Sequence, residues 1–130
     1  MAVTREQAEA WLDAYVAAWK SYDREAIGAL YSEDATSRYH PWDEPIVGRD
    51  AVVESWFGVG EGTPGRDTEG TYEGAYEVAA IDGDLAVITG TSTYTDPAVI
   101  YENCWLVRFD DEGRCREFAE WFMKRPDDLR

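Results

Sequence analysis

The sequence contains one histidine and two cysteines, which is few for a structural metal site. Cys104 and Cys115 have no CxxC spacing and no histidine cluster near them, so a zinc site is not indicated. Both lie in strand-like stretches, where we expect small buried apolar groups with reduced thiols. The stretch GVGEGTPG at 58–65 lacks the lysine and the strand–helix context of a phosphate loop. We therefore expect neither a metal nor a cofactor.

Positive charge is also scarce, with 12 Lys and Arg against 27 Asp and Glu and a net charge of −15. A phosphate backbone or an anionic membrane surface would repel such a chain, so neither is an expected partner. No segment approaches the roughly 20 apolar residues of a membrane span, and the start, MAVTREQAEAW, carries charges. The expectation is a cytoplasmic protein.

Aromatic side chains are the residues that the chain has in excess, with four Phe, six Trp and eight Tyr among 130 residues. This length fits one domain over residues 1–130. Because each ring buries a large area, the rings form a heavy core or line a cavity. We expect most of them in the core and a few around a pocket.

The first half of the chain predicts three helices. Thr4 is the expected N-cap of the first, and Gln7 completes a capping box. Apolar residues then recur at spacings of three and four, at Trp11, Leu12, Tyr15, Val16, Trp19 and Tyr22. A second helix starts at Asp23, buries Ile27, Leu30 and Tyr31, and is closed by Asp34. A third covers 49–57.

The second half predicts a meander of strands. After a first strand over 34–41 and a loop over 58–70, the apolar period changes to two. Turn signals then separate four strands, expected at 72–81, 85–94, 100–109 and 114–124. Segregated helices and antiparallel strands indicate an α+β fold. A long bent sheet around one aromatic helix should leave a cone with an open mouth.

Four segments in this order resemble the nuclear-transport-factor-2-like superfamily, in particular its SnoaL-like and ketosteroid-isomerase-like branches. They are YVAAWKSYD, AIGALYSEDAT, EPIVGRDAV and LVRFDDEGRCREF. The resemblance implies a cone-shaped α+β fold in which a curved antiparallel sheet wraps around a long N-terminal helix with two shorter helices. It also implies a pocket for a small apolar ligand and a homodimer formed through the sheet. The superfamily includes enzymes, binding proteins and assembly domains.

The ketosteroid isomerases of this superfamily use a tyrosine, an aspartate base and a protonated aspartate. Tyr15 matches the tyrosine, Tyr31 a second tyrosine that supports it, and Trp56 a third aromatic group. The base position falls on Tyr39 and the second acid on Trp105, so two of the three groups are missing. The resemblance therefore does not imply steroid isomerisation.

Two other branches place an acid on the last strand, and Glu120 matches it in both. The limonene epoxide hydrolases add an arginine and a second aspartate, which fall on Thr91 and Thr93 here. SnoaL-type polyketide cyclases use the acid alone as a base. The resemblance therefore implies a cofactor-independent isomerase, cyclase or hydrolase.

The residues around Glu120 favour the same role. In REFAEWFM, alternation places Phe118, Glu120 and Phe122 on one face. A carboxylate between two phenylalanines is costly to bury unless it is paired or protonated, and burial raises the pKa of a general base. The other face, with Trp121 and Met123, is also apolar, so an exposed or Arg-paired Glu120 remains an alternative.

Two further residues are candidates for proton transfer. Tyr15 can donate to a developing oxyanion, or can pack as one more aromatic ring on its helix. His40, beside Trp42, is a candidate second proton carrier, or a strand-end histidine bonded to a loop carbonyl. Tyr39 and His40 should point to opposite faces of their strand, so at most one should face the cavity.

The remaining candidates are ligand-binding residues. They are Trp19, Tyr31, Tyr39, Trp56, Asn103, Trp105, Phe118 and Phe122, with Asn103 able to orient a carbonyl. Three functions stay open: an enzyme acting on a polyketide-like or terpenoid carbonyl compound, a non-catalytic binding protein, and an assembly domain. Apolar residues on both faces of the later strands favour a homodimer through the sheet.

Overall fold

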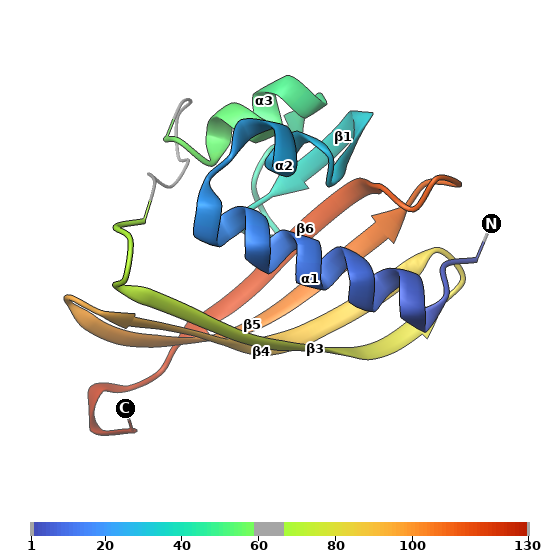
Figure 1. Ribbon diagram of the computed structural model, residues 1–130. Coiled ribbons are helices and arrows are strands. Elements are labelled where there is room, and N and C mark those ends of the chain that lie inside the picture. Colours follow the sequence, from blue (N-terminus) through green and yellow to red (C-terminus); the bar gives the residue numbers. More distant parts are fainter. Residues whose placement is uncertain (1, 59–66, 130) are drawn as a thin grey trace.

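The computed structural model describes residues 2–58 and 67–129 (Figure 1). Most of the loop predicted at 58–70 therefore lies outside the described residues. The helices are α1 (Arg5–Ser21), α2 (Arg24–Gly28), α3 (Arg49–Ser55) and the 3-10 turn η1 (Asp127–Leu129). The strands are β1 (Tyr31–Arg38), β2 (Ile46–Val47), β3 (Tyr72–Asp82), β4 (Leu85–Thr95), β5 (Ala98–Phe109) and β6 (Cys115–Lys124).

Helix α1 begins where the sequence predicts. Thr4 accepts a hydrogen bond from the Gln7 backbone N–H, and the Gln7 side chain accepts one from the Thr4 N–H. The helix ends at Ser21, and its C-cap Tyr22 takes the left-handed conformation with φ 50°. The helix lies over the curved sheet (Figure 1), and the residues that it buries include Trp11, Leu12 and Trp19. The capping box and the 3.6-residue period thus place the aromatic face of α1 inside the fold.

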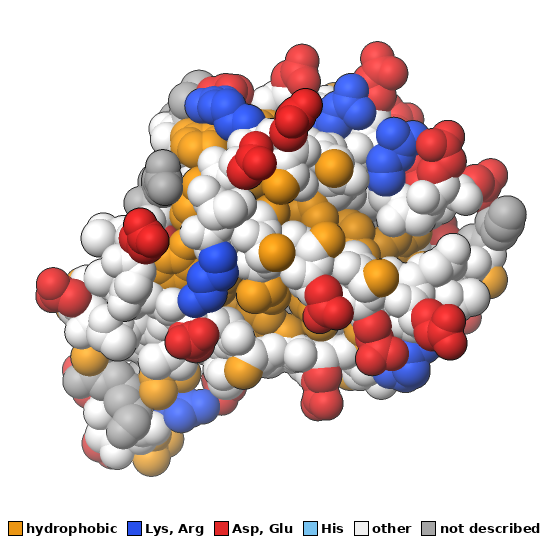
Figure 2. Space-filling view, viewed as in Figure 1, with side chains coloured by type: hydrophobic (Ala, Val, Ile, Leu, Met, Phe, Trp, Pro, Cys, Tyr) orange, Lys and Arg blue, Asp and Glu red, His pale blue; other side chains and the backbone are white. Residues whose placement is uncertain are grey.

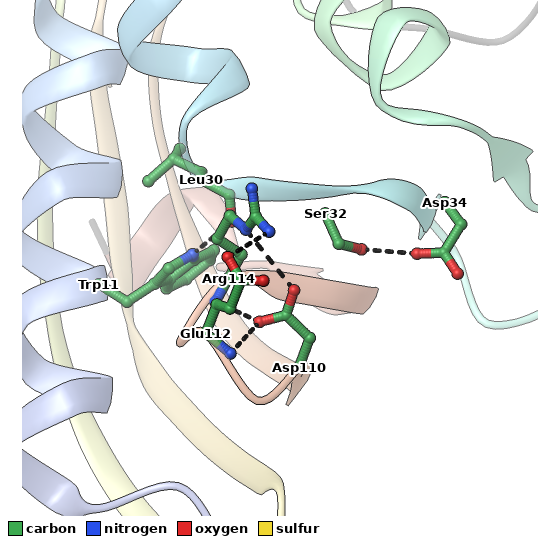
Figure 3. A network of polar contacts seen from close by, with 7 residues as sticks. All are labelled: Trp11, Leu30, Ser32, Asp34, Asp110, Glu112 and Arg114. Atoms are coloured by element: carbon green, nitrogen blue, oxygen red, sulfur yellow. Dashed lines mark hydrogen bonds and ion pairs between the residues drawn. The ribbon is translucent and has the colours of Figure 1, made fainter.

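Helix α2 is shorter than the sequence indicates. It ends at Gly28, and Tyr31 is already the first residue of β1. The Leu30 carbonyl accepts from the Cys115 N–H at 2.8 Å, so pairing with β6 replaces a further helical turn. The prediction that Asp34 closes this helix is wrong, because Asp34 lies inside β1 and accepts from the Ser32 hydroxyl at 2.9 Å (Figure 3).

The strands form one curved, unclosed sheet in the order β2-β1-β6-β5-β4-β3. The meander from β3 to β6 is antiparallel, as predicted. Strand β1 departs from the predicted antiparallel arrangement, because it runs parallel to β6. The sheet is therefore mixed, and the α+β architecture with a long N-terminal helix is confirmed.

The two predicted hairpin turns are present. Gly83 and Gly113 have φ of 61° and 79°, conformations that glycine adopts without strain. At the second turn, one oxygen of Asp110 accepts from the backbone N–H groups of Glu112 and Arg114, both at 2.9 Å (Figure 3). These contacts fix the start of β6, and therefore the position of the residues that follow it.

The core is strongly aromatic. Trp11 packs edge-on against Phe109 at 5.7 Å, and its indole N–H donates to the Leu30 carbonyl at 2.9 Å (Figure 3). On the face shown in Figure 2, acidic side chains are spread out rather than gathered in one patch. No helix in the described part of the chain is both long enough and apolar enough to cross a membrane.

Candidate functional site

A cavity of about 560 Å³ lies between α1, the end of α3 and the concave face of the sheet. This volume falls within the usual range for sites that hold small molecules. Ten of the eighteen lining residues are Phe, Trp or Tyr. They are Tyr15, Trp19, Tyr22, Tyr39, Trp56, Tyr76, Tyr94, Tyr101, Trp105 and Phe122.

Glu120 projects from β6 into this cavity and is held by two donors on β5. The Trp105 indole N–H donates to Oε2 at 2.8 Å, and the Asn103 amide donates to the same oxygen at 3.1 Å. Trp105 is directly opposite Glu120 in the β5–β6 register, and Asn103 lies diagonally across from it. Both bonds end on Oε2, so neither occupies Oε1.

From Glu120 on β6, a chain of hydrogen bonds extends across the three neighbouring strands β5, β4 and β3. The Ser92 hydroxyl donates to Asn103 Oδ1 at 2.8 Å. Because its one proton is used there, the Tyr76 hydroxyl is the donor in the 2.5 Å contact with Ser92. The chain runs from Tyr76 on β3 through Ser92 on β4 and Asn103 on β5 to Glu120. It orients the Asn103 amide with its N–H group toward the carboxylate.

Burial raises the pKa of Glu120 above its ordinary value. The bonds from Trp105 and Asn103, and the proximity of His40, act in the opposite direction by stabilising the charged form. Burial is the largest of these effects, so the net pKa shift is upward. The result is a carboxylate that is more basic than an exposed glutamate and has a fixed orientation, as a general base requires.

Tyr15 lies beside this carboxylate in a shell of other rings. Its ring packs against those of Trp105 at 4.7 Å and Trp56 at 5.1 Å, and stacks on that of Phe118 at 6.0 Å. Burial raises the pKa of Tyr15 well above its ordinary value, and the charge on Glu120 raises it further. Tyr15 therefore remains a protonated donor over the whole physiological pH range.

A second phenol, Tyr39, has its proton engaged elsewhere. The Ser55 hydroxyl donates to the Val52 carbonyl at 2.6 Å, so Tyr39 is the donor in its 2.7 Å contact with Ser55. Tyr76 likewise donates to Ser92. Among the hydrogen bonds of the described residues, none engages the Tyr15 hydroxyl, which distinguishes it from Tyr39 and Tyr76.

His40 lies on the cavity wall and is paired with a carboxylate. Its Nδ1 is 2.9 Å from Asp43 Oδ2, and its ring stacks on Trp42 and contacts Phe122 at 5.2 Å. When the ring is neutral, the bond to Asp43 places its proton on Nδ1 and leaves Nε2 as an acceptor. The partner of His40 is thus a carboxylate rather than a loop carbonyl.

Tyr39 and His40 both line the cavity, which corrects the prediction that at most one of them faces it. Strand β1 ends at Arg38, and the chain bends at the next two residues. Strict alternation of side chains holds only while the backbone stays extended. The bend therefore turns both side chains toward the same side.

Another carboxylate, Asp67, lies on the wall near the C-terminal end of α1. Its Oδ2 accepts from the Trp19 indole N–H at 2.8 Å, and from the hydroxyls of Tyr22 and Tyr94 at 3.3 and 3.5 Å. The Asp67 backbone N–H also donates to the Tyr22 hydroxyl at 2.9 Å. Sequence reasoning missed this residue, because no local pattern links it to helix α1.

The structure places nine of the eleven predicted site residues on the wall of this cavity. The remaining two are Tyr31 and Phe118, which are 1% and 3% exposed and pack behind Trp56 and Tyr15. Tyr76, Ser92, Tyr94 and Tyr101 line the cavity and were not predicted. The alternation of side chains along β4 predicts that Ser92 and Tyr94 share one face of the strand. It does not show that this face is the concave one that lines the cavity.

Thr91 and Thr93, the positions matched to the epoxide hydrolase arginine and aspartate, are not among the lining residues. Ser92 and Tyr94 line the cavity instead, one residue further along β4. A shift of one residue moves a strand's side chains to the opposite face of the sheet. In the described ranges, no group of three His, Cys, Asp or Glu could hold a metal ion.

Comparison with known families gives a match to the SnoaL-like domain over residues 12–118. The chain belongs to the SnoaL-like family. Its fold is that of the nuclear-transport-factor-2-like superfamily, as the resemblance predicted. No curated protein matches the sequence significantly.

Solved structures show the same SnoaL-like fold in distant relatives. A ketosteroid isomerase-like protein from Kribbella flavida is 19% identical with a TM-score of 0.68, over 95% of this chain and 82% of that one. An NTF2-like protein of unknown function from Mesorhizobium loti is 20% identical with a TM-score of 0.68, over 92% and 93% of the two chains. An LEH-like epoxide hydrolase from M. tuberculosis is 17% identical with a TM-score of 0.64, over 92% and 84%.

Proposed function

We propose that this SnoaL-like protein binds a small, largely apolar carbonyl compound in the aromatic cavity and catalyses proton transfer without a cofactor. The observation that carries the proposal is the environment of Glu120. Its carboxylate is partly buried in the cavity wall, its pKa is raised, and Trp105 and Asn103 hold one oxygen in place. The other oxygen is the atom that would remove a proton from carbon.

Tyr15 would act as the electrophile in this mechanism. Removing a proton next to a carbonyl creates an enolate, whose oxygen needs a hydrogen-bond donor. The Tyr15 hydroxyl is held by packed rings close enough to Glu120 for the carboxylate charge to raise its pKa. One cavity would thus contain a base and an oxyanion donor.

His40 would carry the proton away or return it at a second carbon. Its position supports this role, because it lines the same cavity and its charge lowers the pKa of Glu120. The 2.9 Å contact with Asp43 would hold the imidazole during the transfer. Isomerisation and cyclisation both need such a second transfer.

Hydrogen–deuterium exchange into a carbonyl compound tests this proposal at the proton-transfer step alone, whatever the complete reaction. Polyketide fragments and terpenoid ketones would be incubated in D₂O and followed by NMR. Glu120→Gln should slow enzyme-dependent exchange by about 10²–10⁴-fold, and Tyr15→Phe by about 10²–10³-fold. Glu77→Gln, which removes an exposed carboxylate from β3, is the matched control. Exchange that survives Glu120→Gln would overturn the proposal.

The second candidate function is non-catalytic binding of the same class of ligand. It is favoured by the absence of the epoxide hydrolase trio, since Thr91 and Thr93 are not cavity residues. It predicts ligand-induced thermal stabilisation without exchange. A ligand at a hundred times its Kd adds about 2.7 kcal/mol to the free energy of unfolding. Stabilisation by a compound that shows no exchange would favour this candidate.

We further propose that the chain is a homodimer formed through the outer face of the sheet. Trp121 and Met123 alternate with the cavity residues Glu120 and Phe122 on β6, and they are 51% and 72% exposed. Large apolar side chains on the outer face of a sheet favour burial by a partner.

A further inference from the structure

Within the described ranges, the cavity wall has carboxylates but no lysine or arginine. Three of the lining residues, Asp67, Asp96 and Glu120, are carboxylic acids. Among the lining residues that the structure describes, none is lysine or arginine, and the imidazole of His40 is paired with Asp43. The whole chain carries a net charge of −15, so the field outside the cavity has the same sign. An anionic ligand would be repelled both on approach and in the site.

The negative charges of Glu120 and Asp67 both reach the same two tyrosines of the cavity wall. Burial raises the pKa of Tyr76 to about 12 and also raises that of Tyr94, and the charges of Glu120 and Asp67 raise both pKa values further. Tyr76 packs on Trp105 at 4.4 Å, and Tyr94 contacts Trp19 at 6.5 Å. The electron-rich rings of the wall therefore lie within the fields of two carboxylates.

Aromatic rings together with carboxylates form the environment that binds organic cations. The negative face of an indole or phenol ring attracts an ammonium group, and this attraction is strongest when water is excluded. A buried carboxylate is costly until a countercharge reaches it, so a cationic ligand would also remove part of the burial penalty on Glu120. A neutral ligand of the same shape would gain neither contribution.

We propose that the natural ligand of this cavity is an organic cation, a carbonyl compound in which a quaternary or protonated ammonium group is attached to a largely apolar body. The inference rests on the proposed function, because it names the substrate class of the same site. In this proposal the ammonium group lies against the aromatic wall, within the fields of Glu120 and Asp67. The apolar body fills the remainder of the cavity.

Three probes with one scaffold and different charges test the inference by isothermal titration calorimetry. They are 4-(trimethylammonio)benzyl alcohol, its neutral isostere 4-tert-butylbenzyl alcohol, and the anion 4-(hydroxymethyl)benzoate. We expect the cation to bind about thirtyfold more tightly than the neutral isostere, equivalent to about 2 kcal/mol. The anion should bind most weakly.

Variants then test which carboxylates cause the preference for the cation over the neutral isostere. Glu120→Gln and Asp67→Asn should each lower the ratio of cation to neutral affinity at least fivefold. Glu77→Gln changes the net charge equally at an exposed position and should leave the ratio unchanged. The inference is overturned if the cation does not bind or binds no more tightly than the isostere, or if Glu77→Gln lowers the ratio as much as Glu120→Gln.

The exchange assay on carbonyl compounds separates this inference from the proposed function. If the neutral isostere binds as tightly as the cation and Glu120-dependent exchange persists, the charge preference is wrong and proton transfer stands. If the cation preference holds but exchange is independent of Glu120, the site binds cations and the proposed chemistry is wrong.

Discussion

At the residue scale, the burial of Glu120 should make the protein less stable as pH rises. The pKa of Glu120 is raised in the folded state, so the folded protein holds a proton that the unfolded chain has released. Stability from this group is present below the unfolded pKa of about 4.3 and is lost as pH rises through the folded pKa. The loss is about 1.4 kcal/mol for each unit by which the pKa is raised.

Glu120→Gln should remove this loss, because an amide remains neutral and its oxygen can still accept from Trp105 and Asn103. We expect the variant to be more stable than the wild type above the folded pKa, and to have a flatter dependence of unfolding free energy on pH. Urea unfolding from pH 4 to 8 measures both. A variant that is less stable than the wild type at pH 8 would show that the ionised form is the better accommodated one.

The indole of Trp105 affects the pKa of the same carboxylate. Its 2.8 Å bond to Oε2 lowers the pKa of Glu120, so Trp105→Phe should move that pKa upward. The shift is measurable by NMR titration of carbon-13-labelled glutamate carboxyl groups, without a substrate. Trp121→Phe, at an exposed position on β6, is the matched control and should leave the pKa unchanged. An unchanged or lower pKa in Trp105→Phe would contradict the role of this bond.

At the scale of elements, the hydrogen-bond chain depends on close contact between β3 and β4. Tyr76 lies opposite Gly90 in the register, and a Cβ at Gly90 would collide with the Ala75 carbonyl and the Tyr76 side chain. Gly90→Ala should therefore displace Tyr76 from Ser92 and cost about 1–3 kcal/mol of unfolding free energy. Chemical denaturation measures the cost.

Gly28→Ala in α2 is the matched substitution for that prediction. A Cβ at Gly28 meets only Val53 Cγ2, at the ordinary contact distance of 3.8 Å, and alanine favours the helix. This variant should be neutral or slightly stabilising. Equal stabilities of the two variants would show that the contact between β3 and β4 is not tightly packed.

The same elements show what sequence reasoning can reach. Helix α1 and the antiparallel hairpins were predictable, because the capping box, the 3.6-residue period and the turns at Gly83 and Gly113 are local signals. The parallel pairing of β1 with β6 joins Tyr31 to Cys115, and no local pattern carries that information. The same pairing ends α2 early, so a long-range contact overrode a local preference.

The candidate site likewise contains residues that local patterns predict and residues that depend on long-range strand pairing. Glu120 was accessible to sequence reasoning because alternation along one strand placed it between two phenylalanines, and because the family resemblance matched it to an acid on the last strand. The chain from Tyr76 through Ser92 to Asn103 depends on the registers of β3 with β4 and of β4 with β5. A shift of one residue in either register would separate these side chains, so they could be identified only after the strands were paired.

At the scale of the whole molecule, the outer face of the sheet should determine the oligomeric state. We expect a dimer at micromolar concentration by light scattering, because Trp121 and Met123 are exposed there and their burial would stabilise association. The double substitution Trp121→Ser, Met123→Ser should yield a monomer, since each change removes apolar area from the interface. Both residues alternate with the cavity positions, so the monomer should retain its fold.

Trp42→Ser is the control for that dissociation. Trp42 is 80% exposed, but it follows the end of β1 and stacks on His40, away from the outer face of the sheet. Its loss should leave the dimer intact while removing the ring that stacks on His40 in the cavity wall. A wild type that is monomeric at micromolar concentration, or a double variant that still dimerises, would contradict assembly through this face. Because the cavity opens on the opposite face, ligand binding should be equal in the monomeric variant and the dimer.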